Sequence, residues 1–319
     1  MRKILAYFAF CALALSCVRV EPELPVGPEP SDEVLADLSV CPSALEMEGG
    51  SKAVSPLDPS VENTIANLWI LQYADDGRLV KQEYIDESYV SPSGIRPLER
   101  PVLSLSLQAR LVRSQGSTII LIANMGGTHA EDAEWPSSSA FKWGEHGGGS
   151  LYDLGRKLFS CSLENYSGDH LFMTGITEID VTDSGSAVPV NVMLSRLASK
   201  FSVSIKSTVA GLYSNVRLQM VNCPVKMSLF PEELPLAAGT DLVEYAPQQV
   251  CPAGTYLGTD SFSNFYFYSC ENLCAEAGKQ TFIRVLADKE GTPVSVDLPV
   301  SSHRTTFRNT NYSIQISLK

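Results

Sequence analysis

Apolar and polar residues alternate along much of the chain, with the period of two that marks a β-strand buried on one face. The clearest alternation runs through residues 201–206, 216–220 and 312–319. Residues 65–73 and 118–123 are apolar on both faces, as central strands of a sandwich are. The pattern therefore predicts a chain built mainly from antiparallel strands.

Turn and helix signals agree with this prediction. Residues 75–77 read Asp-Asp-Gly, and the strand-like residues 78–85 follow, which predicts a hairpin. Strands separated by turns rich in glycine and proline favour β-sandwiches. One short helix is predicted where leucine recurs at spacings of three and four, at Leu151, Leu154 and Leu158.

The length of the chain favours two such sandwiches. The sequence has 319 residues, which is long for one sandwich domain. The best break is the polar, turn-rich stretch over residues 182–189. We therefore expect an N-terminal β-sandwich over residues 39–183 and a C-terminal β-sandwich over residues 184–319.

Composition supports a packed core and excludes one class of partner. Apolar residues make up 44% of the chain, which is enough for a sizeable core. The net charge is −12, so the phosphate backbone of nucleic acid would repel the protein. We expect no nucleic-acid partner. After the N-terminus, no apolar run is long enough for a membrane-spanning helix.

The first 17 residues resemble the signal of a bacterial lipoprotein. Arg2 and Lys3 precede an apolar stretch over residues 4–15, which is too short to span a bilayer. The stretch ends in Leu-Ala-Leu-Ser-Cys, which resembles a lipobox. This predicts a signal peptide over residues 1–16 and acylation of Cys17, whereas the alternative is an ordinary signal peptide with an incidental cysteine.

A tether is expected between the lipid and the folded part. Residues 18–38 contain four prolines and six acidic residues, so we predict an extended, disordered tether over residues 17–38. Glu21 and Glu23 resemble a surface-export signal of some Gram-negative lipoproteins. The expected location is the outer membrane, lipid-anchored and exposed at the cell surface.

Six cysteines beyond Cys17 are candidates for disulfides, because this compartment permits them. Six cysteines allow 15 pairings, and the sequence does not choose among them. Buried free thiols are the alternative. Cys270 and Cys274 are close in sequence, but no second cysteine pair or nearby histidine accompanies them, so we predict no metal site. The six are Cys41, Cys161, Cys223, Cys251, Cys270 and Cys274.

A search for catalytic motifs finds none. The four histidines lack the i, i+4 spacing of a zinc protease, and neither a G-x-S-x-G elbow nor a phosphate-binding glycine loop occurs. We therefore expect neither an enzyme nor a cofactor. The aromatic run over residues 262–268 fits core packing better than sugar stacking.

Five short segments, in order, resemble the fimbrillin family of type V pilus proteins from anaerobic bacteria. Each segment is short, but together they extend over about 250 residues behind the lipobox. The segments are the hairpin over residues 65–80, Ile122-Ala123-Asn124, Leu171-Phe172-Met173-Thr174-Gly175, Leu194-Ser195-Arg196-Leu197-Ala198-Ser199-Lys200-Phe201 and Arg308-Asn309-Thr310-Asn311-Tyr312.

The resemblance implies two tandem transthyretin-like Greek-key sandwiches and assembly with other pilin subunits by strand addition. In the family, a protease removes an N-terminal segment with the first strand, and a strand from a neighbour fills the groove. The corresponding cut here lies between Lys52 and Ala53 and would remove residues 39–48. The alternative is that Lys52 is an ordinary exposed lysine.

The resemblance further suggests an accessory role. The sequence ends at Lys319, soon after Tyr312, where shaft subunits of the family continue into a donor strand. We therefore expect a terminal subunit, which is an anchor if Lys52 stays intact and a tip if it is cut. The competing hypothesis is a surface glycan-binding lipoprotein, for which Trp135 and Trp143 are the candidate platform.

Overall fold

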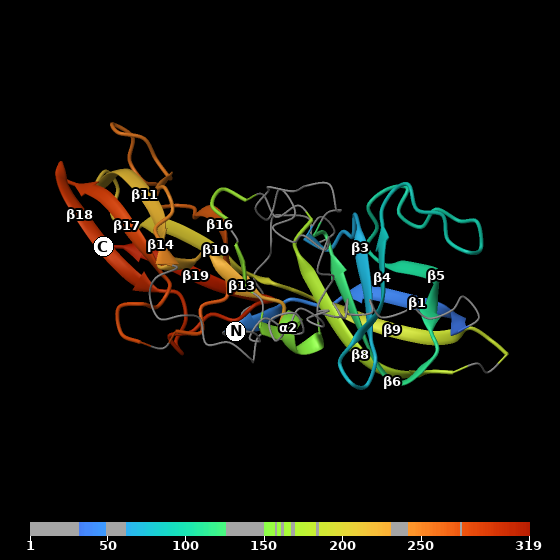
Figure 1. Cartoon of the computed structure of the whole chain (residues 1–319). Coiled ribbons are helices and arrows are strands. Elements are labelled where there is room, and N and C mark those ends of the chain that lie inside the picture. The colour runs from blue at the N-terminus through green and yellow to red at the C-terminus, as the bar shows by residue number, and fades with distance from the viewer. Residues whose placement is uncertain are drawn as a thin grey trace, which may run out of the picture.

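The structure is a computed structural model that describes residues 32–48, 62–125, 150–156, 158–160, 163–166, 170–182, 185–230, 242–274 and 276–319. Within these residues the chain is almost wholly β, and the strands form two lobes placed end to end (Figure 1). The predicted all-β architecture of two tandem β-sandwiches is therefore confirmed. Across the same residues, none of the helical segments has the length and hydrophobicity of a bilayer crossing.

The first lobe is built from seven strands: β1 (Glu33–Pro42), β3 (Leu68–Tyr73), β4 (Leu79–Ile85), β5 (Leu105–Val112), β6 (Ser114–Ala123), β8 (Met173–Val181) and β9 (Val188–Arg196). They form one sheet in the order β4-β3-β6-β8-β9-β1-β5. In the described residues, β8 and β9 pair at two positions, Met173 with Arg196 and Thr174 with Ser195. The sheet divides there into two layers, which enclose a single apolar core.

The central strands of this lobe agree with the sequence analysis. All six residues of β3 are buried, and so are the last seven of β6. The predicted hairpin joins β3 to β4, and Gly77 in its turn has a φ of +78°, which glycine adopts without strain. The ring of Trp69 in β3 lies 4.8 Å from that of Tyr84 in β4, centroid to centroid. Trp69 is therefore a core residue.

The second lobe is a sandwich of two four-stranded sheets that share one core. One sheet has the order β16-β10-β19-β2 and the other β15-β11-β17-β18. The predicted alternation over residues 201–206, 216–220 and 312–319 falls in β10, β11 and β19. The strands are β2 (Glu46–Glu48), β10 (Ala198–Ser207), β11 (Tyr213–Val221), β15 (Gln248–Gln249), β16 (Ser263–Cys270), β17 (Phe282–Lys289), β18 (Thr292–Pro299) and β19 (Thr310–Leu318).

A third apolar cluster joins the two lobes. It combines Trp69 and Tyr73 of the first lobe with Tyr268 and Cys270 of the second. The helix α2 (Leu151–Arg156) packs on it through Leu154, which confirms the predicted short helix at Leu151 and Leu154, whereas Leu158 lies in a strand instead. Two small ladders complete the fold, β7 (Leu158–Ser160) with β13 (Lys226–Ser228) and β12 (Cys223–Pro224) with β14 (Leu242–Val243).

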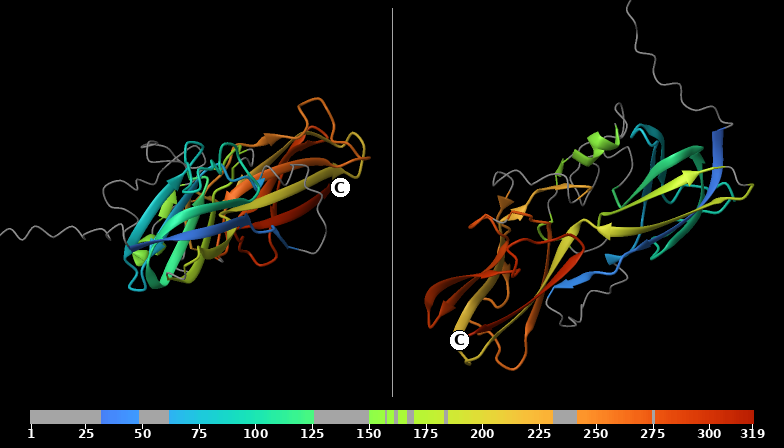
Figure 2. Two further views of the ribbon diagram at one scale, coloured as in Figure 1. Left: turned by 90° about the vertical axis from the view of Figure 1, so that its right-hand side faces the viewer. Right: turned by 90° about the horizontal axis from the view of Figure 1, so that it is seen from below.

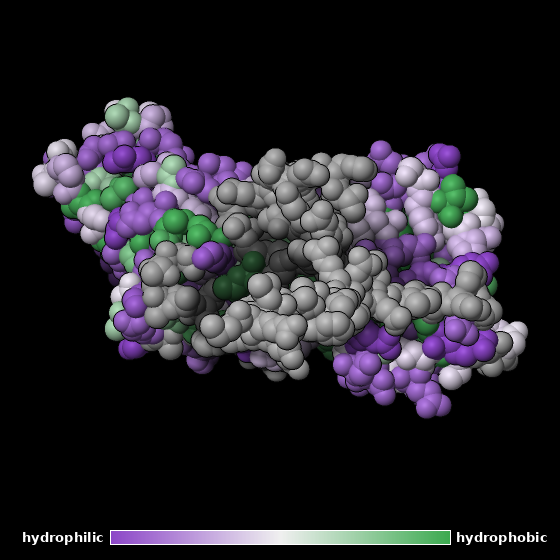
Figure 3. All heavy atoms as spheres, viewed as in Figure 1, coloured by the Kyte–Doolittle hydropathy of each residue, from purple (hydrophilic) through white to green (hydrophobic). Residues whose placement is uncertain are grey.

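The surface away from these cores is mostly hydrophilic. On the face shown in Figure 3, the described residues of both lobes are largely polar, with small separate apolar patches. The second-lobe edge strand β18 carries Pro293 and Pro299 and the charged Asp297. Prolines and charges on an edge strand hinder unwanted pairing with other chains.

Two boundaries differ from those that the sequence predicts. Residues 33–38, assigned to the tether, form the first part of β1, because Val34, Ala36 and Leu38 lie at every second position and enter the core. The turn-rich residues 182–189 lead into β9 of the first sheet, because Val190 and Val192 also enter that core. Apart from β2, the second lobe therefore begins at β10, after Leu197.

The tight approach of β8 and β9 gives a stability prediction. A Cβ atom on Gly175 would lie 2.5 Å from both the carbonyl oxygen of Met193 and Cγ1 of Val192. We expect Gly175→Ala to lower the free energy of unfolding in urea by about 1–3 kcal/mol, because backbone must move. A Cβ atom on Gly258 would have no other atom within 4 Å. Gly258→Ala should therefore change the free energy of unfolding by less than about 0.5 kcal/mol. Equal effects of the two substitutions would contradict this account.

Candidate functional site

Residues 33–48 form a segment that we call the N-terminal arm. Its first strand, β1, lies between β5 and β9, antiparallel to β5 and parallel to β9. Its second strand, β2, pairs in parallel with β19 of the other lobe. The arm therefore adds one strand to each sandwich, and Figure 2 shows β1 within the first lobe.

The arm is held in the first lobe by apolar side chains that alternate along β1. Full burial of a valine or leucine side chain stabilises the folded state by about 1.5–3 kcal/mol. Ala36 is wholly buried, so its site in the core takes a small side chain. The outward side chains between them are half-buried at Leu35 and exposed at Asp37 and Ser39. The buried side chains are Val34, Ala36, Leu38 and Val40.

Two side chains hold the linker between β1 and β2. Arg196 Nη1 donates to the carbonyl oxygen of Ser43 at 3.0 Å and to Asn309 Oδ1 at 2.6 Å. Asn309 Nδ2 donates to Ser43 Oγ at 3.0 Å and to the Ala44 carbonyl oxygen at 2.9 Å. The Ser43 amide donates to Leu194 O at 2.8 Å. We call Arg196, Asn309, Ser43 and Ala44 the arm-binding cluster.

The two side chains that hold the linker, Arg196 and Asn309, are buried, which makes each of their hydrogen bonds important. Arg196 is 2% exposed and Asn309 6% exposed. Burial lowers the pKa of the Arg196 guanidinium, and the nearby Glu62 carboxylate opposes that shift. The Nε atom of Arg196 is buried without a hydrogen-bond partner. Because a buried polar group left unpaired costs about 1–3 kcal/mol, loss of the arm would leave this cluster in an unfavourable state.

A buried ion pair holds the chain at Glu62, the first described residue after the arm. Glu62 forms an ion pair with Lys200 of β10, and both side chains are almost fully buried. The hydroxyl of Tyr268 donates to Glu62 Oε1 at 2.9 Å. Burial, followed by the Glu62 charge, raises the pKa of Tyr268, so the phenol stays protonated as a donor. This pairing connects the start of the described chain after residue 61 to the second lobe.

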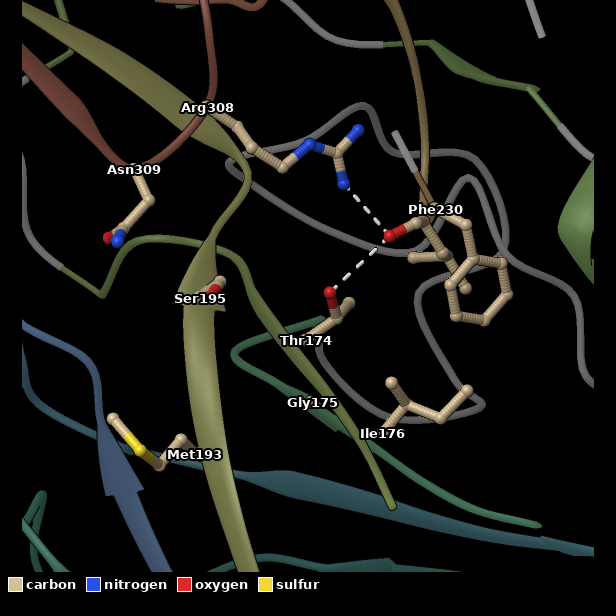
Figure 4. A pocket seen from close by; sticks show the side chains of 9 residues that line it. Thr174, Gly175, Ile176, Met193, Ser195, Phe230, Arg308 and Asn309 are labelled. Carbon is tan, nitrogen blue, oxygen red and sulfur yellow. Dashed lines mark hydrogen bonds between the residues drawn. The ribbon is translucent and has the colours of Figure 1, made fainter. Parts of the chain in front are cut away.

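A third cation, the largely buried Arg308, lies at the junction, by which we mean the contact region between the two lobes. Arg308 pairs with Glu271 and donates from Nη1 to Leu229 O at 2.8 Å and from Nη2 to Ser228 O at 2.9 Å. Figure 4 shows Arg308 and Thr174 directing hydrogen bonds to the same carbonyl oxygen of Leu229. The pocket beside them has a volume of about 310 Å³. Because Arg308 is already paired, this pocket offers no unmatched charge to a ligand.

Several of the segments that carried the family resemblance supply residues that hold the arm or nearby backbone. Arg196 and Asn309 hold the arm, and Lys200 pairs with Glu62. Asn124 ends β6 with a φ of +66°, and its amide bonds to backbone of residues 64, 66 and 171. The ring of Tyr312 stacks on Phe201 in the second core at 5.2 Å, centroid to centroid. The residues that stand out in these segments therefore have structural roles: they bind the arm, bind backbone or pack in a core.

Three residues of the site were missed by the sequence analysis. Ser43 and Glu62 lie in polar stretches that carry no motif, and Glu271 follows the aromatic run. Each gains its role from a partner more than 35 residues away in sequence. Such partners are set by tertiary structure, so no local signal identifies them.

Several predicted site residues lie outside the described residues. These are Cys17, Lys52, Ala53, Trp135, Trp143 and Cys161. Cys41 is exposed on β1 and Cys274 is half-buried, whereas Cys223, Cys251 and Cys270 are buried. All five are free thiols in the structure, which shows none of the predicted disulfides among them, and the sixth candidate, Cys161, is not described. Among the described residues, no group of three or more His, Cys, Asp or Glu side chains is placed to hold a metal.

The comparisons with known proteins agree with this geometry. No family model matches the chain, and no curated protein matches it. Solved structures do, beginning with a proposed cell adhesion protein of Parabacteroides distasonis, with a TM-score of 0.58 and 16% identity over 89% of this chain and 88% of that one. This chain has the fold of cell adhesion and fimbrial proteins.

Two further structures support that assignment of fold. The C-terminally truncated tip fimbrial protein of Porphyromonas gingivalis gives a TM-score of 0.56 and 14% identity over 88% of this chain and 94% of that one. A fimbrial assembly protein of Parabacteroides distasonis gives a TM-score of 0.51 and 14% identity over 89% of this chain and 92% of that one. The similarity covers both lobes, so the tandem arrangement is part of the shared fold.

The arm-binding cluster gives a prediction about local stability. Asn309→Gly keeps the left-handed backbone but removes both side-chain bonds to the arm. We expect amide hydrogen exchange in β2 and the linker to rise about 10- to 100-fold, as loss of about 1.4–2.8 kcal/mol implies. Asn222→Gly is the control, because Asn222 is also left-handed and bonds to carbonyl groups of Gly278 and Gln280. A selective effect on the arm in both variants would be inconsistent with the cluster.

The cysteine environments predict which thiol reacts first. Cys41 is exposed on β1, whereas burial raises the pKa of the Cys223 thiol to about 12. Thiolate is the reactive form, so at pH 8 an alkylating reagent should modify Cys41 and leave Cys223 intact until the protein unfolds. Peptide mapping by mass spectrometry of native and urea-unfolded protein measures this. Modification of Cys223 in native protein at the rate of Cys41 would show that the second lobe opens.

Proposed function

We propose that this chain is a non-enzymatic terminal or accessory subunit of a cell-surface fimbria and joins its neighbours by β-strand exchange. The observation that carries the proposal is the N-terminal arm, which supplies one strand to each sandwich. Lys52 lies four residues after the end of the arm in sequence. Cleavage there would cut the covalent link between the arm and the rest of both lobes, so that only strand pairing and packing would hold the arm.

Removal of the arm would create a strong binding site for another strand. The edges of β5, β9 and β19 that pair with the arm would lose hydrogen-bond partners. The inward sites of Val34, Leu38 and Val40 would open as apolar pockets. An incoming strand with the same alternation satisfies the backbone groups and fills the pockets together.

Two of the structural neighbours support this role. One is a tip fimbrial protein and another a fimbrial assembly protein. In the proposal, Cys17 carries the lipid that attaches the chain to the outer membrane. Intact Lys52 corresponds to a membrane anchor and cleaved Lys52 to a tip subunit, because cleavage also removes the lipid.

The N-terminus of the mature chain tests this proposal. We expect the chain to co-purify with surface fibres from the producing bacterium, and mass spectrometry then reads its first residue. A lipidated Cys17 identifies an anchor, and Lys52→Gln should then leave fibre association unchanged. An N-terminus at Ala53 identifies a tip subunit, and Lys52→Gln should then reduce fibre association at least tenfold.

Two results would overturn the fimbrial role. One is absence of the wild-type chain from purified fibres. The other is binding to glycans that is lost on Trp135→Ala or Trp143→Ala without any fibre association, which would favour the glycan-binding lipoprotein. Both tryptophan variants serve as controls in the fibre assay, where we expect no change.

A further inference from the structure

The outer face of the arm forms the floor of a groove that strand exchange does not use. The groove has a volume of about 520 Å³ and crosses β5, β1 and β9. These strands lie side by side in the first lobe (Figure 1). Its volume falls in the range of about 300–1,000 Å³ that is common for small-ligand sites.

The floor consists of two rows of outward-facing side chains. In one row Asp37 lies opposite Gln108 on β5 and Pro189 on β9. In the next row Ser39 lies opposite Ser106 and Asn191. Gln108 Nε2 donates to Asp37 Oδ1 at 3.0 Å, which orients both side chains. The floor therefore presents hydroxyl, amide and carboxylate groups on three adjacent strands.

The side wall is a firmly held loop between β4 and β5. The Ser91 amide donates to Ile95 O at 2.9 Å, and the Gly94 amide donates to Ser91 O at 2.8 Å. Leu98, 1% exposed, anchors the loop in the core. Ile95 and Pro97 line the groove beside the polar floor, and Ile95 is 64% exposed. An apolar wall thus faces a polar floor.

We propose that this groove binds a neutral saccharide. Serine, asparagine and glutamine side chains both donate and accept hydrogen bonds, as sugar hydroxyls require. The C–H face of a sugar ring fits against Ile95 and Pro97. The described lining residues include the carboxylate of Asp37 and no cation, so an anionic ligand is disfavoured. The floor strand β1 is paired on both sides, so a peptide cannot add to it as a strand.

Binding in this groove is coupled to retention of the arm. Asp37 and Ser39 belong to β1, so the complete floor exists only while β1 is seated. A ligand that binds only the form with β1 in place multiplies the equilibrium constant for that form by 1 plus the ratio of ligand concentration to Kd. The saccharide therefore opposes release of the arm. This goes beyond the proposed function, because it holds whether or not the chain enters a fimbria.

The first test is binding of the full chain to an array of neutral, sulfated and sialylated oligosaccharides. We expect neutral oligosaccharides to be retained, and Ser106→Leu, which places a leucine on the groove floor, to reduce their binding at least tenfold. Ser313→Leu is the matched control, because Ser313 is also an outward, exposed serine in a strand but lies in the second lobe. Should Ser106→Leu fold poorly, Asn191→Ala replaces it.

The second test measures the coupling with the neutral oligosaccharide that the array retains most strongly. At about nine times its Kd, amide exchange in β1 should slow about tenfold, while exchange in β11 and β17 stays unchanged. No neutral binding at millimolar concentration, or binding equally reduced by Ser313→Leu, overturns the site. Binding without slower exchange in β1 overturns the coupling. Fibre association is read separately, so these outcomes do not depend on the fimbrial proposal.

Discussion

The structure depends on the seating of one strand between two others. β1 satisfies backbone groups of β5 on one side and β9 on the other, and its inward side chains complete the core of the first lobe. A sheet interior tolerates neither unpaired amides nor empty apolar sites. Loss of the segment that fills this place is therefore costly, because it leaves unpaired backbone groups and empty apolar sites.

Buried cations at the junction extend this constraint to both lobes. Arg196 binds the arm linker, Lys200 pairs with Glu62, and Arg308 pairs with Glu271. Buried ion pairs contribute little net stability, because desolvation offsets their attraction, but losing one partner is costly. Through Arg196 and Lys200, the arm linker and the chain at Glu62 are tied to residues of β9 and β10.

The two faces of β1 serve different purposes. The inward face is aliphatic and sets how firmly the strand is held, whereas the outward face carries Asp37 and Ser39 into a polar groove. A strand has a period of two, so one short stretch presents both faces at once. The same residues thereby link the stability of the arm with the chemistry of the surface.

The sequence by itself determined the fold class, the central strands and the hairpin, because alternation of apolar residues and turn chemistry are local signals. It also located Arg196, Gly175 and Asn309 in short recognisable segments, but without their partners. Only the tertiary structure decided that residues 33–38 are a strand and that β9 closes the first sheet, because their apolar residues become core only when distant strands pair with them. The partners Ser43, Glu62 and Glu271 likewise lie far away in sequence, and burial at the junction, which no local pattern encodes, gives them their roles.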